Sequence, residues 1–167
     1  DCSSRGLGDV YKRQLVVEPY LSSVVMSGTI IENSDHKNKS SIIEKIISGE
    51  HQMSVAYAEP NIGYKFFDCY ASTSVSNNIL SLNGTKSLVL NAGNANQFIV
   101  LAKHEGLSAL IMVDAEVDGL SIQSFKTIDG QTCGELTFEN VLIDTDSIIA
   151  SGDDAEVIFN KMMDLAI

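Results

Sequence analysis

The sequence predicts an α+β fold, in which an antiparallel β-barrel domain is flanked by partial α-helical domains. Three observations carry this prediction. Apolar residues first recur at three- and four-residue spacing, then alternate with polar residues in many short runs after position 51, and return to helical spacing after position 150. Many short strands at close spacing, without helical patterns between them, are typical of an antiparallel barrel or sandwich.

Residues 15–51 are predicted to be the end of an N-terminal helical domain. A first helix is expected over 17–32, because its apolar side chains share one face, and Pro19 suits the first turn, where a missing N–H costs nothing. In a second helix Ser41 and Glu44 form a candidate capping box, and Gly49 is a candidate C-terminal cap. We expect this helical hairpin to pack on the core without chemistry of its own.

Residues 52–150 are the predicted barrel domain, in which apolar and polar residues alternate between turn signals. The expected strands are residues 53–58, 68–75, 79–82, 85–90, 98–103, 109–114, 120–125, 135–139 and, more weakly, 141–143. Glu59-Pro60 ends the first strand, because proline lacks the N–H that a sheet ladder needs.

Asn83-Gly84 lies between two apolar runs and predicts a hairpin, because both central residues of a type I′ turn need positive φ. We therefore expect residues 53–58 and 85–91 to lie in one antiparallel unit.

The two ends of the chain differ from the barrel region. Residues 151–167 are predicted to start a C-terminal helical domain, since an acidic first turn leads into an amphipathic pattern. Residues 1–14 are basic and have no helical or strand period, so they are predicted to be a non-native leader that packs against nothing, or a native disordered tail. Helical character on both sides of the barrel suggests the middle of a longer protein.

Composition excludes several classes of function. The net charge of −11 disfavours a nucleic-acid partner, whose phosphates need Lys and Arg. No apolar run approaches the ~18 residues of a membrane span, and no signal peptide is recognisable, so a soluble cytoplasmic protein is expected. The three cysteines, Cys2, Cys69 and Cys133, form no C-x-x-C pair and are expected to stay reduced.

No metal site is predicted. The carboxylates Asp114, Glu116 and Asp118 lack the fuller oxygen-ligand pattern of a calcium loop, so a solvated turn is expected. The histidines lack ligand spacing, and each is expected to be solvated: His36, His51 and His104.

A series of motifs carries a family resemblance through its order and spacing. The motifs are Glu18-Pro-Tyr-Leu21, Ile46-Ile-Ser-Gly49, Ala56-Tyr-Ala-Glu-Pro60, Leu82-Asn-Gly-Thr-Lys86, Asn94-Ala-Asn-Gln-Phe-Ile-Val100, Leu110-Ile-Met-Val-Asp114 and Glu135-Leu-Thr-Phe-Glu-Asn-Val141. From about residue 15 to residue 167 the chain resembles the middle of an acyl-CoA dehydrogenase. The first and third motifs most resemble the small subunit of pimeloyl-CoA dehydrogenase and related subunits of heteromeric enzymes.

The resemblance implies an FAD-dependent oxidoreductase of fatty acid metabolism that desaturates acyl-CoA thioesters between Cα and Cβ. A carboxylate base takes the α proton and flavin N5 receives the β hydride. The implied flavin-binding positions are Tyr57, Ala58, Glu59, Leu88, Val89 and Leu90, and the implied acyl-CoA positions are Gly63 and Tyr64.

Several of these positions depart from the family pattern. Ala58 and Leu90 stand where typical members have Thr, which removes two hydroxyl donors from the flavin edge at a cost of ~1–3 kcal/mol for each lost hydrogen bond. Leu88 stands in place of Trp and Tyr64 in place of Ser. Backbone N–H groups of residues 57–59 and 89–91 remain as substitutes.

Two positions carry alternative interpretations. Tyr57 either offers an aromatic face to the flavin or is a barrel core residue. For Glu59 we favour a structural role, in which its carboxylate accepts hydrogen bonds from the turn after Pro60. No residue is assigned as the catalytic base, because in this family that carboxylate comes from the C-terminal helical domain.

The leading hypothesis is therefore a fragment of a flavin-dependent acyl-CoA dehydrogenase that acts on medium-length or dicarboxylic acyl-CoA, within a homo- or hetero-oligomer. The fragment is expected to be inactive alone and to fold poorly alone. One alternative is a structural partner subunit whose flavin site has decayed. Another is a non-catalytic β-barrel binding module, which the amphipathic helices on both sides disfavour.

Overall fold

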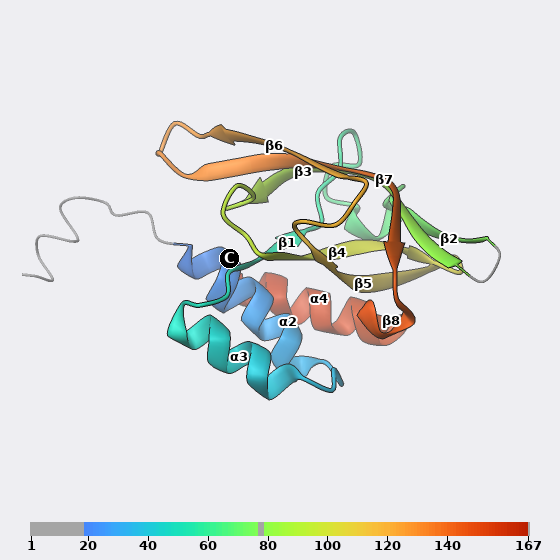
Figure 1. The fold of residues 1–167 in the computed structure, drawn as a ribbon, viewed down its shortest axis with the longest axis horizontal. Helices are drawn as coiled ribbons and strands as arrows, with labels where there is room; N and C mark the ends of the chain where they lie inside the picture. Colours follow the sequence, from blue (N-terminus) through green and yellow to red (C-terminus); the bar gives the residue numbers. More distant parts are fainter. Residues whose placement is uncertain (1–18, 77–78, 167) are drawn as a thin grey trace, which may run out of the picture.

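The computed structural model describes residues 19–76 and 79–166 and contains an eight-stranded sheet with helices packed on one side (Figure 1). The predicted α+β class is confirmed. The strands are β1 (Met53–Ala56), β2 (Ser72–Ser76), β3 (Ile79–Leu90), β4 (Gln97–His104), β5 (Leu107–Asp114), β6 (Leu120–Lys126), β7 (Thr132–Ile143) and β8 (Ile148–Ser151). The helices are η1 (Tyr20–Ser27), α2 (Gly28–Asn33), α3 (Lys39–Ser48), α4 (Asp153–Ala166) and the short turns η2 (Phe66–Asp68) and η3 (Thr145–Ser147). The predicted leader, residues 1–14, lies outside the described residues.

The sheet folds over into two layers, with β3, β6 and β7 above β1, β4 and β5 in Figure 1. Hydrogen-bonded neighbours follow the order β6-β7-β3-β2-β4-β5-β8, and β1 pairs with β4. Five of the strand pairings are antiparallel, as expected. The exceptions are β1, which runs parallel to β4, and a single parallel contact between β2 and β4.

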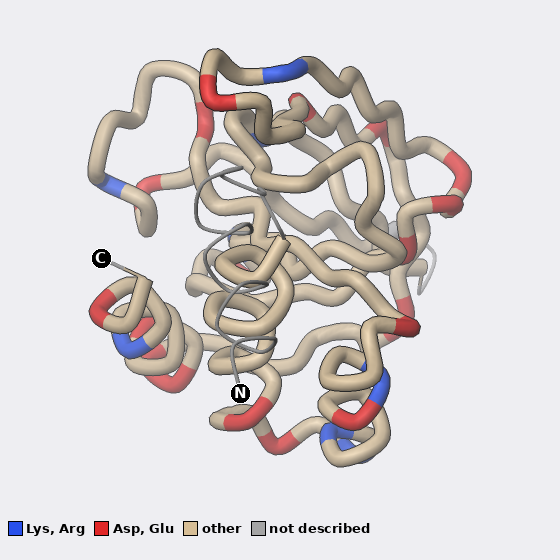
Figure 2. Tube along the Cα trace, turned by 90° about the vertical axis from the view of Figure 1, so that its left-hand side faces the viewer, with Lys and Arg blue, Asp and Glu red and all other residues tan. Residues whose placement is uncertain are grey.

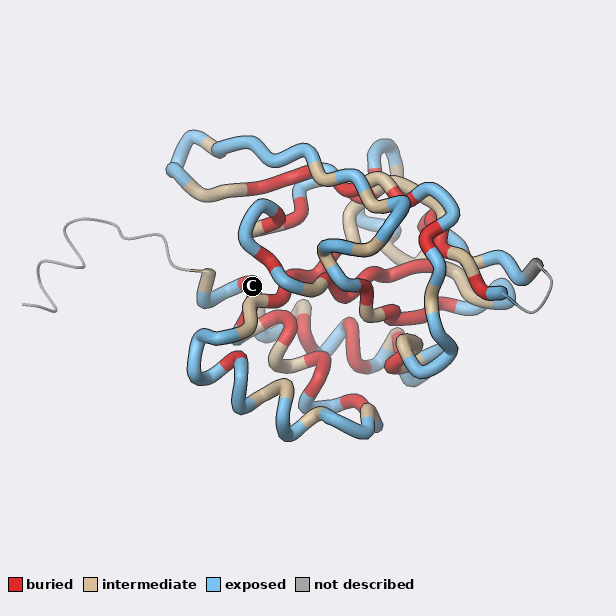
Figure 3. The backbone as a smooth tube through the Cα atoms, in the orientation of Figure 1, coloured by how far each residue is buried: buried red, intermediate tan, exposed pale blue. Residues whose placement is uncertain are grey.

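Two apolar cores hold the molecule together, and β4 belongs to both. Successive side chains of a strand point to opposite faces, so Phe98 and Val100 enter the core between the sheet layers, whereas Ile99 and Leu101 pack toward the helices. All four are fully buried. Figure 3 shows the resulting band of buried backbone along the centre of the sheet and on the helix faces that cover it.

The predicted Asn83-Gly84 hairpin is wrong. Both residues lie inside β3, a continuous strand from Ile79 to Leu90, at an irregularity in its pairing with β7. The positive φ of Gly84, 143°, serves close packing instead of a turn, because a Cβ on Gly84 would lie 2.6 Å from Cα and Cβ of Ala71. Asn83 fills the irregularity by accepting a hydrogen bond from the backbone N–H of Asn140 at 2.8 Å.

The expected antiparallel unit of residues 53–58 and 85–91 is also wrong. β1 ends at Ala56 and pairs in parallel with β4, while β3 pairs with β2 and β7. The pattern predicted strands correctly, but alternation of apolar residues does not say which strands become neighbours.

The helices differ from the prediction at their ends. The first begins with the π-helical turns of η1 and continues directly into α2. The capping box at Ser41 and Glu44 is not formed, because α3 already begins at Lys39, after Asn38, without a side-chain cap. Gly49 ends α3 with φ 77°, as predicted. The short strand β8, which was not predicted, precedes α4.

The acidic residues are spread over loops and helices instead of forming one patch (Figure 2). None of the helices in the described ranges has the length and apolar character needed to cross a membrane. Cys69 and Cys133 are buried free thiols, and Cys2 lies outside the described residues.

Candidate functional site

The two chain segments implied to contact a flavin meet at one place in the fold. The backbone N–H of Ser87 in β3 donates a hydrogen bond of 2.9 Å to the carbonyl oxygen of Ala58, two residues beyond the end of β1. Residues 57–59 and 88–90 therefore lie side by side, although β1 and β3 are not ladder partners.

A buried ion pair links these two segments. The Nζ atom of Lys86 lies 2.6 Å from Oε1 of Glu59, and the side chains are 0% and 3% exposed. Lys86 also donates to the carbonyl oxygen of Tyr57 at 3.4 Å. Burial lowers the pKa of Lys86, and the hydrogen bond that Lys86 donates to Glu59 opposes this shift.

The carboxylate of Glu59 has further donors just before the next strand, β2. Its Oε2 accepts from the backbone N–H of Tyr70 at 2.7 Å, and its Oε1 accepts from that of Ala71 at 3.0 Å. The structural role predicted for Glu59 is confirmed, but its donors follow the whole loop 60–69 instead of the turn directly after Pro60. Lys86 was not among the predicted site residues; the available signal was that it is the single charged residue of this strand.

The loop closed by Glu59 carries both implied acyl-CoA positions. Gly63 is exposed with φ 58°, and a Cβ added there would meet no atom within 4 Å. Tyr64 is 94% exposed, and its ring contacts Phe66 edge to face with the centroids 6.2 Å apart. The loop therefore presents a large aromatic side chain on the surface beside the two segments.

Tyr57 lies within an aromatic cluster that joins this loop to α4. Its ring meets Phe66 at a centroid distance of 5.1 Å and Phe159 at 5.6 Å, both edge to face. Burial raises the pKa of its hydroxyl. These contacts favour the core-residue interpretation of Tyr57 over the ligand-facing one.

Residues 88–90 of β3 differ in how far they are exposed. Leu88 has φ 53°, lies at a second pairing irregularity with β7 and is 64% exposed. Val89 is buried, with only 1% of the residue exposed. Leu90 is half-buried. Of the backbone donors, the N–H of Asn91 is already bonded to the carbonyl of Thr132 at 2.6 Å.

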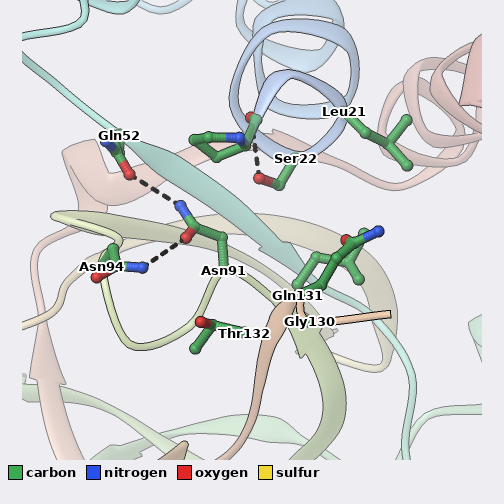
Figure 4. Close-up of a pocket in the computed structure, with 10 residues that line it drawn as sticks. Leu21, Ser22, Gln52, Asn91, Asn94, Gly130, Gln131 and Thr132 are labelled. Atoms are coloured by element: carbon green, nitrogen blue, oxygen red, sulfur yellow. Dashed lines mark hydrogen bonds between the residues drawn. The ribbon is translucent and has the colours of Figure 1, made fainter. Parts of the chain in front are cut away.

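A polar cavity of about 240 Å³ opens beside the end of this segment (Figure 4). Asn91 Nδ2 donates to Gln52 Oε1 at 2.9 Å, and Asn94 Nδ2 donates to Asn91 Oδ1 at 2.9 Å. Leu90 and Thr132 also line it. Gln52, Asn91 and Asn94 were not among the predicted site residues, although the cluster of asparagines after β3 was a visible signal.

The histidines do not all match the expectation of solvated side chains. His51 shares a hydrogen bond of 3.0 Å with Gln97, and His104 shares one of 2.8 Å with Thr73. Across residues 19–76 and 79–166, no three His, Cys, Asp or Glu side chains are grouped so that they could hold a metal ion.

Comparison with known proteins identifies one family. Residues 54–141 match the family model described as acyl-CoA dehydrogenase, middle domain. The mitochondrial isovaleryl-CoA dehydrogenase of Solanum tuberosum is 26% identical over 129 residues, which cover 72% of this chain and 31% of that protein. The chain thus spans about a third of the length of this relative.

Solved structures share the fold. The ChsE4–ChsE5 complex from Mycobacterium tuberculosis superposes with a TM-score of 0.78 at 22% identity, covering 93% of this chain and 42% of the matched chain. A glutaryl-CoA dehydrogenase from Mycobacterium smegmatis in complex with FADH2 gives a TM-score of 0.75 at 18% identity, covering 85% of this chain and 38% of the other. Both likenesses extend beyond the sheet to the flanking helices, since each covers more than residues 54–141.

Proposed function

We propose that this chain, which belongs to the acyl-CoA dehydrogenase family, forms the flavin-facing middle part of an enzyme that desaturates acyl-CoA thioesters. The observation that carries the proposal is the hydrogen bond of 2.9 Å between Ser87 N–H and the Ala58 carbonyl. It brings the two segments with the implied flavin positions together at one surface, next to the loop with the implied acyl-CoA positions.

The residues at this surface fit the apolar part of a flavin ring. Leu88 leaves a large aliphatic side chain exposed, and Ala58 beside it is small enough to leave room for a planar group. Ala58, Leu88 and Leu90 would hold FAD, with backbone groups in place of the missing Thr hydroxyls. When bound, FAD would supply the hydride acceptor for the Cβ–H bond.

The chain's own residues position the reactants instead of moving protons. Glu59 is the one acid among the implied flavin positions, but its carboxylate is buried and bonded to Lys86, Tyr70 and Ala71. It is therefore not available as the base that removes the α proton. We place that base in a part of the full-length protein outside these residues, as in the family at large.

We further propose that the full-length protein works as a subunit of a homo- or hetero-oligomer on medium-length or dicarboxylic acyl-CoA. The likeness to a two-component complex and to a glutaryl-CoA dehydrogenase supports this proposal at the level of fold. The resemblance of Glu18-Pro-Tyr-Leu21 and Ala56-Tyr-Ala-Glu-Pro60 to the small subunit of pimeloyl-CoA dehydrogenase supports the heteromeric form.

A second candidate is a structural subunit that has lost its flavin. Two observations favour it: Tyr57 packs its ring into the aromatic cluster, and the N–H of Asn91 is already bonded to Thr132. Together with the missing hydroxyls at Ala58 and Leu90, these leave fewer donors for a flavin edge.

The test is to purify the full-length protein and measure bound flavin by visible absorption, with L88E beside L142E as a matched control. Leu88 and Leu142 are 64% and 63% exposed, so both changes put a charge on an exposed apolar position of the same sheet. We expect a yellow wild type and L142E, and a colourless L88E. A wild type that stays colourless when expressed with its partner subunit would support the structural subunit instead.

A further inference from the structure

The loop 60–69, which carries Gly63 and Tyr64, is closed at its base by a single carboxylate. Glu59 precedes the loop, and Tyr70 and Ala71 follow it; both of their N–H groups donate to Glu59, at 2.7 and 3.0 Å. The loop bears the most exposed large side chain next to the candidate site, Tyr64, yet its two ends meet at a residue that is 7% exposed.

The same carboxylate is tied to β3. Lys86 reaches Glu59 from the middle of that strand, at 2.6 Å and with no exposed side-chain surface. Two residues further along β3 lies Leu88, and between them the N–H of Ser87 bonds to Ala58. One ion pair therefore connects the end of β1, the base of the loop and the strand that presents Leu88 and Leu90.

We propose that the Glu59–Lys86 ion pair is a positioning device, which holds the loop 60–69 at a fixed place relative to the flavin-facing strand and so determines how acyl-CoA enters the site. This inference rests on the proposed function. Glu59 and Lys86 are positioning residues, because they act through the loop and the strand and lie behind the surface where a ligand would bind.

Geometry distinguishes this role from simple stabilisation. A buried charge pair must satisfy all its hydrogen-bonding groups to offset its desolvation. Glu59 meets this requirement with three donors from two other segments, namely Lys86 in β3 and the backbone amides of Tyr70 and Ala71 just before β2. A pair that only stabilised the core would not need to gather both ends of the loop at one carboxylate.

The experiment compares the full-length protein with E59Q, E59D and the control D68N. E59Q keeps the length of the side chain and removes its charge, whereas E59D keeps the charge and shortens the reach. Asp68 is an exposed carboxylate at the end of the same loop, so D68N removes one charge without touching the ion pair. Amide hydrogen exchange at Tyr70 and Ala71 and steady-state kinetics with glutaryl-CoA, butyryl-CoA and isovaleryl-CoA are measured for each.

We expect exchange at the Tyr70 and Ala71 amides to be about tenfold faster in E59Q and E59D, because each loses part of its hydrogen bonding to Glu59. We also expect KM for the thioester that turns over best to rise roughly tenfold, while kcat falls less than about threefold, since loss of positioning weakens substrate binding. D68N should match the wild type in both measurements. E59D keeps the proposal falsifiable if E59Q does not fold.

Two results would overturn the proposal in different ways. Unchanged exchange at Tyr70 and Ala71 in both variants would show that Glu59 does not fasten the loop, whatever the enzyme does. Faster exchange with an unchanged KM would show that the loop position does not control access of acyl-CoA. A wild type without flavin or turnover would instead overturn the proposed function, and with it the role of the loop in acyl-CoA access. The exchange data would still show whether Glu59 holds the loop in place.

Discussion

The two ion pairs within residues 19–76 and 79–166 have nearly the same geometry and opposite surroundings. Glu59 and Lys86 are 2.6 Å apart with side chains 3% and 0% exposed, whereas Lys37 and Asp146 are 2.8 Å apart with side chains 77% and 73% exposed. The pKa of Lys86 is lowered, because the loss of hydration on burial outweighs the hydrogen bond to Glu59. The pKa of Lys37 is raised, because the hydrogen bond to Asp146 dominates.

This difference shows that burial, and not distance, decides what an ion pair contributes. In water the attraction between two charges is weak and is screened by salt, so the exposed pair has little to lose. In the interior both charges have left water, and removal of either one leaves the other without compensation. The two pairs should therefore respond very differently to the same kind of substitution.

The largest effect should come from Lys86→Met, which removes the buried cation and leaves Glu59 buried. We expect the free energy of unfolding of the full-length protein to fall by about 3–5 kcal/mol. Urea denaturation measures it. The double variant E59Q/K86M should be more stable than K86M alone, because Gln keeps an acceptor for Tyr70 and Ala71 without a buried charge. A loss below about 1 kcal/mol for K86M would mean that burial does not set the strength of this pair.

Gly84→Ala tests the packing that brings Ala71 to the buried carboxylate. A Cβ on Gly84 would lie 2.6 Å from Ala71, whose N–H is one of the donors to Glu59, so the two strands would have to move apart. We expect a loss of roughly 2–3 kcal/mol in urea denaturation. Gly106 also has positive φ, 82°, but has nothing within 4 Å, so G106A should cost only the backbone strain of about 1 kcal/mol. Equal losses for the two variants would rule out the close contact as the cause.

The sequence predicted individual elements better than their neighbours. The apolar run of β4 and the glycine that ends α3 follow from local rules, and both were predicted correctly. Asn83-Gly84 follows the same kind of local rule, but Gly84 is explained by Ala71, the residue just before β2. The same dipeptide, Asn-Gly, can mark either a tight turn or a close contact between two backbones, and only the tertiary structure distinguishes the two.

The candidate site shows the same limit. Its backbone positions at 57–59 and 88–90 were located by motif, and the structural role of Glu59 was anticipated. The partner Lys86 lies 27 residues away, and the donors Tyr70 and Ala71 lie beyond a loop. β8 was missed, because four residues carry too little periodicity to distinguish a strand from a turn.

A smaller effect of the buried pair should appear in the pH dependence of the free energy of unfolding of Glu59→Gln. Glu59 raises the pKa of Lys86 against burial, and Cys69 is the other titratable group that acts on it, so E59Q should lower this pKa further from the ordinary 10.5. Between the lowered and the ordinary pKa the unfolded chain binds more protons than the folded chain, so the free energy of unfolding increases with pH. We expect the stability of E59Q to come closer to that of the wild type as the pH rises toward the ordinary pKa of lysine. A difference that does not change with pH would mean that Lys86 stays charged without its partner.

The smallest effect should come from Lys37→Met, which breaks the exposed pair. Asp146 stays exposed after the change, so no charge is left buried, and in the wild type salt already screens the attraction between the two side chains. We expect the urea midpoint of K37M to equal that of the wild type at physiological salt, and any difference at low salt to disappear when salt is added. D146N should behave in the same way, since it removes the other partner of the same pair. A loss in K37M comparable with that in K86M would contradict the comparison, because it would show that two exposed charges can contribute as much as two buried ones.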